Sequence, residues 1–183
     1  MKYWSKALLS IYKYLESMVD SIDKTISKST KNNTSCISDR QSAYFQASRI
    51  IELIDRKRKM INLKVAFEES LVRLNSKERR ILGLAYIDGV KSEVIAELMG
   101  ISIRTFFRLK SLALTHLSQE LQLCGFDKDY FDTEYGQEKW FVSVHDELVI
   151  KSTNSDDYLN RALVKRIMAE IPKVYVSNSY TIY

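Results

Sequence analysis

The chain has 183 residues, of which 45% are hydrophobic and 28% are charged, a balance typical of one or two small folded domains. One proline and five glycines leave few signals for strands and turns and favour long helices. No apolar run approaches the ~20 residues that a membrane span requires. Lys13, Glu16 and Asp20 interrupt the apolar N-terminal stretch, which argues against a signal peptide. We therefore expect a cytoplasmic protein without a membrane segment.

The net charge of +5 is unevenly distributed along the chain. Residues 1–48 carry 7 basic and 4 acidic side chains, and residues 49–117 carry 14 basic and 8 acidic ones. Residues 118–183 carry 7 basic and 11 acidic side chains, so the C-terminal part is acidic. A positive surface attracts polyanions, and phosphate contacts supply most of the sequence-independent affinity for DNA. The charge therefore favours a nucleic-acid partner for the middle of the chain.

The first predicted element is a helix over about residues 2–27. Its apolar residues recur at spacings of three and four, which places them on one face that packs lengthwise against another helix. The following stretch, residues 27–38, is rich in Ser, Thr and Asn and predicts a loop. The predicted apolar stripe comprises Trp4, Leu8, Ile11, Leu15, Met18, Ile22 and Ile26.

A second long helix is predicted from Ser38 or Asp39, either of which can cap it, to about Leu74. It would form an antiparallel hairpin with the first helix, and the exposed remainder of the hairpin could form a homodimer interface. The basic run at residues 56–59 is either a solvated helix surface or a phosphate-contacting patch. The predicted apolar side comprises Ala43, Ala47, Ile50, Ile54, Ile61, Val65 and Val72, widened by Ile51 and Leu53.

Residues 74–117 predict three short helices, the last two joined by a tight turn, which is the plan of a helix-turn-helix. Asn75 is the expected cap of the first helix, with Glu78 completing a capping-box-like pair, and Asp88-Gly89 ends it. Ser92 is expected to cap the second helix, whose inward residues would be Ile95, Ala96 and Leu98. Gly100 supplies the turn, and Ser102 caps a third helix from Ile103 to about Leu121.

The third helix has a core stripe of Phe106, Leu109, Ala113 and Leu117, so its opposite side is the candidate surface for the major groove. Arginine can make two hydrogen bonds to guanine, and Ile or Phe can press on a thymine methyl group. Nearby lysines and arginines suit phosphate contacts better than base contacts. The predicted DNA-contacting residues are Ser102, Ile103, Arg104, Thr105, Phe107, Arg108 and Ser111 on the helix, with Lys91, Lys110, Arg79 and Arg80 around it.

Several short runs in this segment follow a known family pattern: Lys77-Glu78-Arg79 with Ile81-Leu82, then Tyr86-Ile87-Asp88-Gly89, residues 94–102, Thr105-Phe106, and Ala113-Leu114 with Leu117. With these runs the segment resembles the fourth conserved region of bacterial RNA polymerase sigma factors and the related phage late-gene transcription activators. The resemblance implies recognition of promoter-type DNA, often with a contact to RNA polymerase. No second sigma-like region is found in residues 1–73, which favours a standalone regulator with a sigma-like reading head.

The C-terminal residues give weaker signals. Residues 126–136 are acidic and aromatic and predict an irregular segment, whereas residues 138–151 predict a helix, with a strand as the alternative. Asp156 or Asp157 is expected to cap a helix that reaches Ile171 and carries Leu159, Leu163 and Ile167 on one face. Pro172 ends it, and a short strand or loose end follows.

We find no pattern for catalysis, a cofactor or a metal. Cys36 and Cys124 lie 88 positions apart and form neither a metal-ligand spacing nor a disulfide framework. The acidic residues 127–134 lack the glycine and distal glutamate of an EF-hand loop. His145 and the neighbouring Asp146 and Glu147 point to different sides of a helix, and no nucleophile partners them.

The sequence therefore predicts an all-α protein in three parts: a helical hairpin over residues 1–73, a sigma-like helix-turn-helix domain over residues 74–122 and an acidic extension over residues 123–183. The predicted function is sequence-specific binding of double-stranded DNA in transcription regulation. The alternative is a module that binds RNA polymerase or another protein without reading DNA. A recombinase-like enzyme is a third hypothesis, which the lack of a catalytic constellation disfavours.

Overall fold

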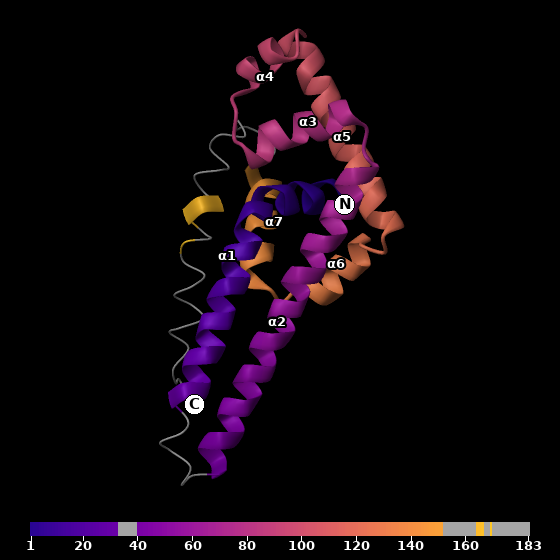
Figure 1. Cartoon of the computed structure of the whole chain (residues 1–183). Helices are drawn as coiled ribbons and strands as arrows, with labels where there is room; N and C mark the ends of the chain where they lie inside the picture. Colours follow the sequence, from indigo (N-terminus) through magenta and orange to yellow (C-terminus); the bar gives the residue numbers. More distant parts are fainter. Residues whose placement is uncertain (33–39, 152–163, 167–168, 170–183) are drawn as a thin grey trace.

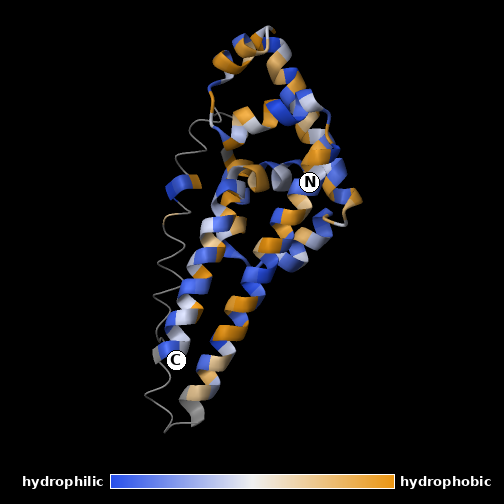
Figure 2. Ribbon diagram, viewed as in Figure 1, coloured by the Kyte–Doolittle hydropathy of each residue, from blue (hydrophilic) through white to orange (hydrophobic). Residues whose placement is uncertain are grey.

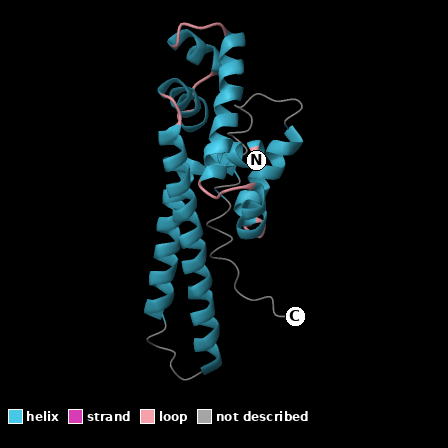
Figure 3. Ribbon diagram, turned by 90° about the vertical axis from the view of Figure 1, so that its right-hand side faces the viewer, coloured by secondary structure: helices cyan, strands magenta, loops and turns pink. Residues whose placement is uncertain are grey.

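The computed structural model describes residues 1–32, 40–151, 164–166 and 169. Within these residues every regular element is a helix and none is a strand, which confirms the predicted all-α class (Figure 3). None of the described helices is both long enough and apolar enough to cross a bilayer. The elements are α1 (Lys2–Asn32), α2 (Arg40–Arg73), α3 (Ser76–Leu82), the π-helical turn η2 (Gly83–Ile87), α4 (Ser92–Leu98), α5 (Ile103–Leu123), α6 (Lys128–Tyr135) and α7 (Lys139–Lys151).

Three groups of helices make up the molecule (Figure 1). The long helices α1 and α2 lie side by side as an antiparallel hairpin. At one end of the hairpin, α3, η2, α4 and the first half of α5 form a small head. Helices α6 and α7 lie beside the part of the hairpin nearest the head, and α7 packs against α1. Helix α1 therefore contacts all three groups.

The apolar stripe predicted for α1 is confirmed. Six of its seven residues, from Trp4 to Ile22, are buried at 5% exposure or less, and Ile26 is half-buried. The helix is longer than predicted, because Ser27 to Asn32 continue it instead of starting a loop. The hydroxyl of Thr30 donates a hydrogen bond to the Ile26 carbonyl, so this polar stretch satisfies itself within the helix. The rest of the predicted loop, and the predicted caps Ser38 and Asp39, lie outside the described residues.

The predicted extent of α2 is confirmed, but its predicted inward face is wrong. Ile54, Ile61, Val65 and Val72 are between 41% and 67% exposed, and Ile51 is 66% exposed. The face that packs on α1 and α5 instead carries a second apolar stripe, in which Leu53 is the only residue that the prediction had included. The buried residues of α2 are Leu53, Met60, Leu63, Ala66, Phe67 and Ser70.

The basic run Arg56-Lys57-Arg58-Lys59 is ion-paired within the protein. Lys57 Nζ lies 2.7 Å from a carboxylate oxygen of Asp23 on α1, and Arg58 pairs with Asp55 at 2.6 Å. Lys59 donates a 2.9 Å hydrogen bond to the Glu134 carbonyl, and Arg56 lies 3.9 Å from Glu138. These contacts join the hairpin to the acidic extension, so they favour the structural reading of the run over the phosphate-contacting one.

An aromatic cluster joins the start of α1 to α6 and α7. Trp4 stacks on Phe131 at a centroid distance of 5.4 Å and lies 5.1 Å from Phe141. Tyr135 lies 5.6 Å from Phe141, and its hydroxyl donates a 2.9 Å hydrogen bond to the Lys59 carbonyl. These aromatics are nearly fully buried. They therefore make the extension a part of the hydrophobic core.

The prediction of an irregular segment at residues 126–136 is wrong, because α6 occupies most of it. Asp127, one of its acidic residues, caps the helix by accepting a 2.8 Å hydrogen bond from the Tyr130 amide. The helical reading of residues 138–151 is confirmed by α7, and the strand alternative is wrong. Of the later predictions, residues 164–166 are helical, with Val164 buried. The caps Asp156 and Asp157, most of the stripe to Ile171 and the final segment lie outside the described residues.

The place of α6 in the core predicts its energetic weight. Phe131→Ala should lower the free energy of unfolding by about 3–5 kcal/mol, because it removes a fully buried ring and leaves a cavity. Asp129→Ala, at an exposed position of the same helix, should change it by about 0.5 kcal/mol or less. Denaturant unfolding followed by circular dichroism measures both variants. Equal stability of the two would mean that α6 does not contribute to the core.

Candidate nucleic-acid interface

The first helix of the head begins as predicted. The Asn75 side chain accepts a 2.9 Å hydrogen bond from the Glu78 amide and caps α3. The Glu78 carboxylate does not complete the predicted capping box, since it pairs with Nδ1 of His116 on α5. Gly89, with φ of 78°, ends the segment in the left-handed conformation that favours glycine. The cap and the His116 contact together fix α3 across α5.

The turn between α4 and α5 also follows the sequence. Gly100 has φ of 64°, and the Ile101 amide returns to the Ala96 carbonyl at 3.0 Å. Ser102 caps α5 by accepting a 3.1 Å hydrogen bond from the Thr105 amide. Two details differ. Lys91 rather than Ser92 occupies the cap position of α4, without a side-chain hydrogen bond, and Leu98 is 56% exposed instead of facing inward.

Helix α5 presents its predicted core stripe to the rest of the head. Phe106, Ala113 and Leu117 are fully buried, and Leu109 is half-buried against the core. Helices α3 and α4 both pack against α5, and so hold its first half at the tip of the molecule (Figure 1). The opposite side of that half faces away from the protein.

The residues predicted to contact DNA from α5 lie mostly on this outward side. Arg104, Arg108, Ser102 and Ser111 are exposed. Ile103 and Phe107 are 41% and 48% exposed, respectively. Thr105 is half-buried, and its hydroxyl lies 2.9 Å from that of Ser102. The structure thus brings the predicted α5 residues onto one surface, which we call the α5 outer face.

The two arginines of the α5 outer face are one helical turn apart, at positions i and i+4. Neither Arg104 nor Arg108 makes a hydrogen bond or ion pair with the residues that the structure describes. Both guanidinium groups therefore retain all their donors for an external acceptor. Around them, Arg79 and Arg80 at the end of α3 and Lys91 before α4 are also exposed.

Lys110 departs from the prediction of a phosphate contact. Only 7% of it is exposed, and its Nζ lies between 5.4 and 5.6 Å from the ring centroids of Tyr86, Phe106 and Phe107. The ammonium group is held by cation–π contacts inside the head. Lys110 therefore contributes to the packing of the head, and its burial contradicts the predicted phosphate contact.

The N-terminus of α1 marks where the α5 outer face ends. Lys2 Nζ donates a 2.8 Å hydrogen bond to the Ser111 hydroxyl, and the hydroxyls of Ser5 and Ser118 lie 2.9 Å apart in the core. Lys2 is exposed and adds a positive charge beside the predicted face. Sequence reasoning missed Lys2, because no pattern in the chain indicates that residues 109 positions apart meet.

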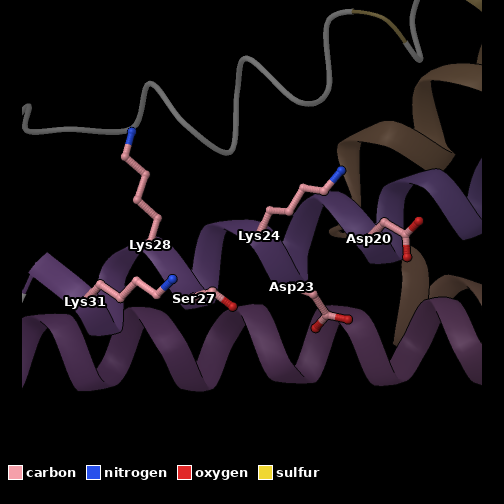
Figure 4. Close-up of a pocket in the computed structure, with 6 residues that line it drawn as sticks. All are labelled: Asp20, Asp23, Lys24, Ser27, Lys28 and Lys31. Atoms are coloured by element: carbon pink, nitrogen blue, oxygen red, sulfur yellow. The ribbon is translucent and has the colours of Figure 1, made fainter.

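A second basic surface lies on α1, far along the hairpin from the head. Lys24, Lys28 and Lys31 border a shallow groove together with Asp20, Asp23 and Ser27 (Figure 4). Asp23 points toward α2, where it pairs with Lys57, whereas Lys24 and Lys28 point away from α2. This surface contains no grouping that indicates catalysis. Among the described residues, no three His, Cys, Asp or Glu side chains gather where they could hold a metal ion.

A capped three-helix head, with a glycine turn and an exposed cationic side on its last helix, defines the helix-turn-helix class of domain. Residues 64–117 match the family model of sigma-70 region 4. The matched 54 residues run from the last part of α2 to Leu117 on α5. They form a sigma-70 region 4-like helix-turn-helix domain, a DNA-binding kind of domain related to transcription. No curated protein and no solved structure matches the chain.

The turn that orients α5 gives a test that isolates backbone strain. A Cβ atom at Gly100 would meet nothing within 4 Å, and the same holds at Gly83, but only Gly100 has a positive φ. Gly100→Ala should therefore cost about 1–2 kcal/mol of stability. Gly83→Ala should cause no loss, because alanine is the better helix former. Thermal and denaturant unfolding of both variants checks the difference, and a Gly100→Ala variant as stable as the parent would contradict the left-handed turn.

Proposed function

We propose that the protein is a sequence-specific transcription regulator that binds double-stranded DNA with the α5 outer face in the major groove. The observation that carries this proposal is the exposure of Arg104 and Arg108, without partners among the described residues, on the outward side of the third helix of the head. The sigma-70 region 4 match supports it, since such domains in general interact with DNA and RNA polymerase. We assign no catalytic role, cofactor or metal.

Base recognition would come from four residues of α5. Arg104 and Arg108 can each donate two parallel hydrogen bonds to O6 and N7 of guanine. Ile103 and Phe107, at 41% and 48% exposure, offer apolar surface for thymine methyl groups. Because all four project from the same side of one helix within six residues, they would read a few adjacent base pairs.

The backbone of the DNA would be held by groups on either side of α5. Arg79, Arg80 and Lys91 are exposed cations on the neighbouring elements, and Ser102 lies at the start of α5. Such contacts fix the orientation of the protein on the duplex without reading sequence. Lys2, beside Ser111, joins this set in our proposal.

A contact with RNA polymerase is the second candidate function. Val94 and Leu98, four positions apart on α4, are 42% and 56% exposed. An exposed apolar patch favours a protein partner. Chain variants that lose DNA binding but retain binding to RNA polymerase would favour this role over direct readout.

The DNA-reading role is tested by selecting bound sequences from a random pool of duplexes and measuring variants on the selected site. Arg104→Ala and Arg108→Ala should each weaken binding to that site by about 1–3 kcal/mol and leave binding to random DNA nearly unchanged. Fluorescence anisotropy at fixed salt measures both affinities. Equal losses on selected and random DNA would contradict the assignment of the two arginines to base readout.

The backbone contacts predict a different signature in salt titrations. Lys91→Ala should weaken binding to all sequences alike and reduce the slope of log K against log salt by about 0.9, the value for one lost phosphate contact. Lys110→Ala is the matched control, since a buried lysine held over aromatic rings should affect stability and leave the slope unchanged. A reduced slope for Lys110→Ala would overturn its assignment to the packing of the head.

A further inference from the structure

Helix α2 is apolar on two opposite sides, and the residues that the structure describes cover only one of them. Leu53, Met60, Leu63 and Phe67 are buried at 4% exposure or less, where α2 packs on α1 and α5. On the other side lie aliphatic residues with exposures of 41–67%, which we call the α2 seam. The α2 seam comprises Ile51, Ile54, Ile61, Val65 and Val72. A helix that is hydrophobic on both sides is expected to be buried on both.

The α2 seam follows a heptad repeat. Its residues are spaced by three, seven, four and seven, so they fall on the a and d positions of a register whose two other positions between Ile51 and Val72 are Arg58 and Glu68. The same register continues back to Ala47 and Tyr44, both exposed. Glu68, at a d position, contacts α1, where its carboxylate accepts a 2.6 Å hydrogen bond from the hydroxyl of Tyr12. The pattern is that of a coiled-coil interface rather than of scattered surface residues.

Among the described residues, the α2 seam borders open space along the hairpin. Ile54, Arg58 and Ile61 line a shallow groove of about 480 Å³ with Asp23, Ile26, Lys57 and Asn62. Hydrophobic positions recur along the whole of α2 (Figure 2), and in two views the half of the hairpin away from the head projects beyond α5, α6 and α7. None of these three helices covers that half.

We propose that the occupant of the α2 seam is the same seam of a second copy of this chain, in a parallel α2–α2 coiled coil. A heptad stripe is self-complementary, because each a or d side chain fits between those of an identical helix. From Tyr44 to Val72 the register spans 29 residues, or about 43 Å of helix at 1.5 Å per residue. With α1 on the outer side of each α2, the assembly is a four-helix arrangement.

The flanking charges favour the parallel orientation. In a parallel pair, a g residue faces the e residue five positions later on the partner. Lys64 occupies g and lies 3.5 Å from Glu16 of its own α1, and Glu69 occupies e, so in a parallel pair Lys64 would also face the partner's Glu69, twice by symmetry. In an antiparallel pair g residues face g residues, so a pair centred on Lys57, next to Arg58, would instead bring the two copies of Lys57 together.

Arg58 supplies the specificity of the interface at a cost in affinity. A single charged residue at a central a position weakens a coiled coil but restricts its register and oligomeric state. Arg58 is 67% exposed at its side chain and is neutralised by Asp55 at 2.6 Å within the same helix. Its long stem can lie along the seam while the guanidinium reaches water. The proposal therefore predicts that this position limits the strength of the dimer.

A parallel dimer places both heads at the same end of the hairpins. Two α5 outer faces would then act on one duplex, and the two-fold axis predicts an inverted repeat in the bound sequence. The dimer itself does not depend on DNA binding, so it is tested on the protein alone.

Sedimentation velocity of the full chain without DNA, over a range of protein concentrations, tests the dimer. The parent should dimerise, and Ile54→Glu and Val65→Glu should each weaken dimerisation at least about 100-fold, since each would bury an unpaired carboxylate. Arg58→Ile should strengthen it. Leu123→Glu is the matched control, because Leu123 is an exposed aliphatic residue outside the seam, at 74% exposure, and should leave the dimer unchanged.

The orientation is tested by oxidative cross-linking in a background with Cys36→Ser and Cys124→Ser. Val72→Cys alone should form an intermolecular disulfide, because equal a positions face each other in a parallel pair. Cross-linking only between Tyr44→Cys and Val72→Cys chains would overturn the parallel orientation.

A parent that is monomeric at all concentrations, or a dimer unaffected by Ile54→Glu and Val65→Glu, would overturn the proposal. A monomer in which the backbone amides of the α2 seam are protected from hydrogen exchange would also overturn it, because another segment of the same chain would then cover the seam.

Discussion

The arrangement of the protein depends on the apolar face of α1. This face runs from Trp4 to Ile22, and its residues are buried almost completely. A helix with such a stripe cannot stay exposed in water, since each large apolar side chain gains about 1.5–3 kcal/mol on burial. No single neighbour covers the stripe. Helix α2 packs along it, whereas α5 and α7 join it near the N-terminus, so one helix holds the hairpin, the head and the extension together.

The position of the candidate site follows from that packing. The second half of α5 is buried against α1, where the Ser5 and Ser118 hydroxyls meet in the core. The first half of α5 lies in the head, where the small helices α3 and α4 pack against it. Ser111, bonded to Lys2, lies at the border between the two halves. Because α1 contacts α5 at Ser111 and Ser118, it leaves Arg104 and Arg108 in the first half of α5 exposed.

Charge also has two distinct roles in this chain. The basic run on α2 is neutralised by carboxylates of α1, α2 and the acidic extension, and it joins parts of the structure. The basic residues of the head, Arg79, Arg80, Arg104 and Arg108, are exposed. Net charge by segment could not separate these roles, because both groups lie in the same positive stretch of the sequence.

The local features of the protein follow from residues that are neighbours in the sequence. The caps Asn75 and Ser102, the left-handed glycines Gly89 and Gly100 and the inward side of α5 could all be predicted, because each depends on residues within a few positions of one another. The same holds for the fold class and for the sigma-like head. The acidic residues 127–134 led to the wrong prediction of an irregular segment, because Phe131 and Tyr135, which make α6 part of the core, have partners on α1 and α7.

Which helix faces meet depends on contacts between distant parts of the chain. Helix α2 has two apolar stripes, and periodicity gives the spacing of each but no reason to prefer Leu63 over Ile61 as the residue that turns inward. That choice depends on the shape and charge of α1 and α5, including the pairing of Lys57 with Asp23. The burial of Lys110 against the ring of Tyr86, and the approach of Lys2 to Ser111, likewise require side chains that only folding brings together.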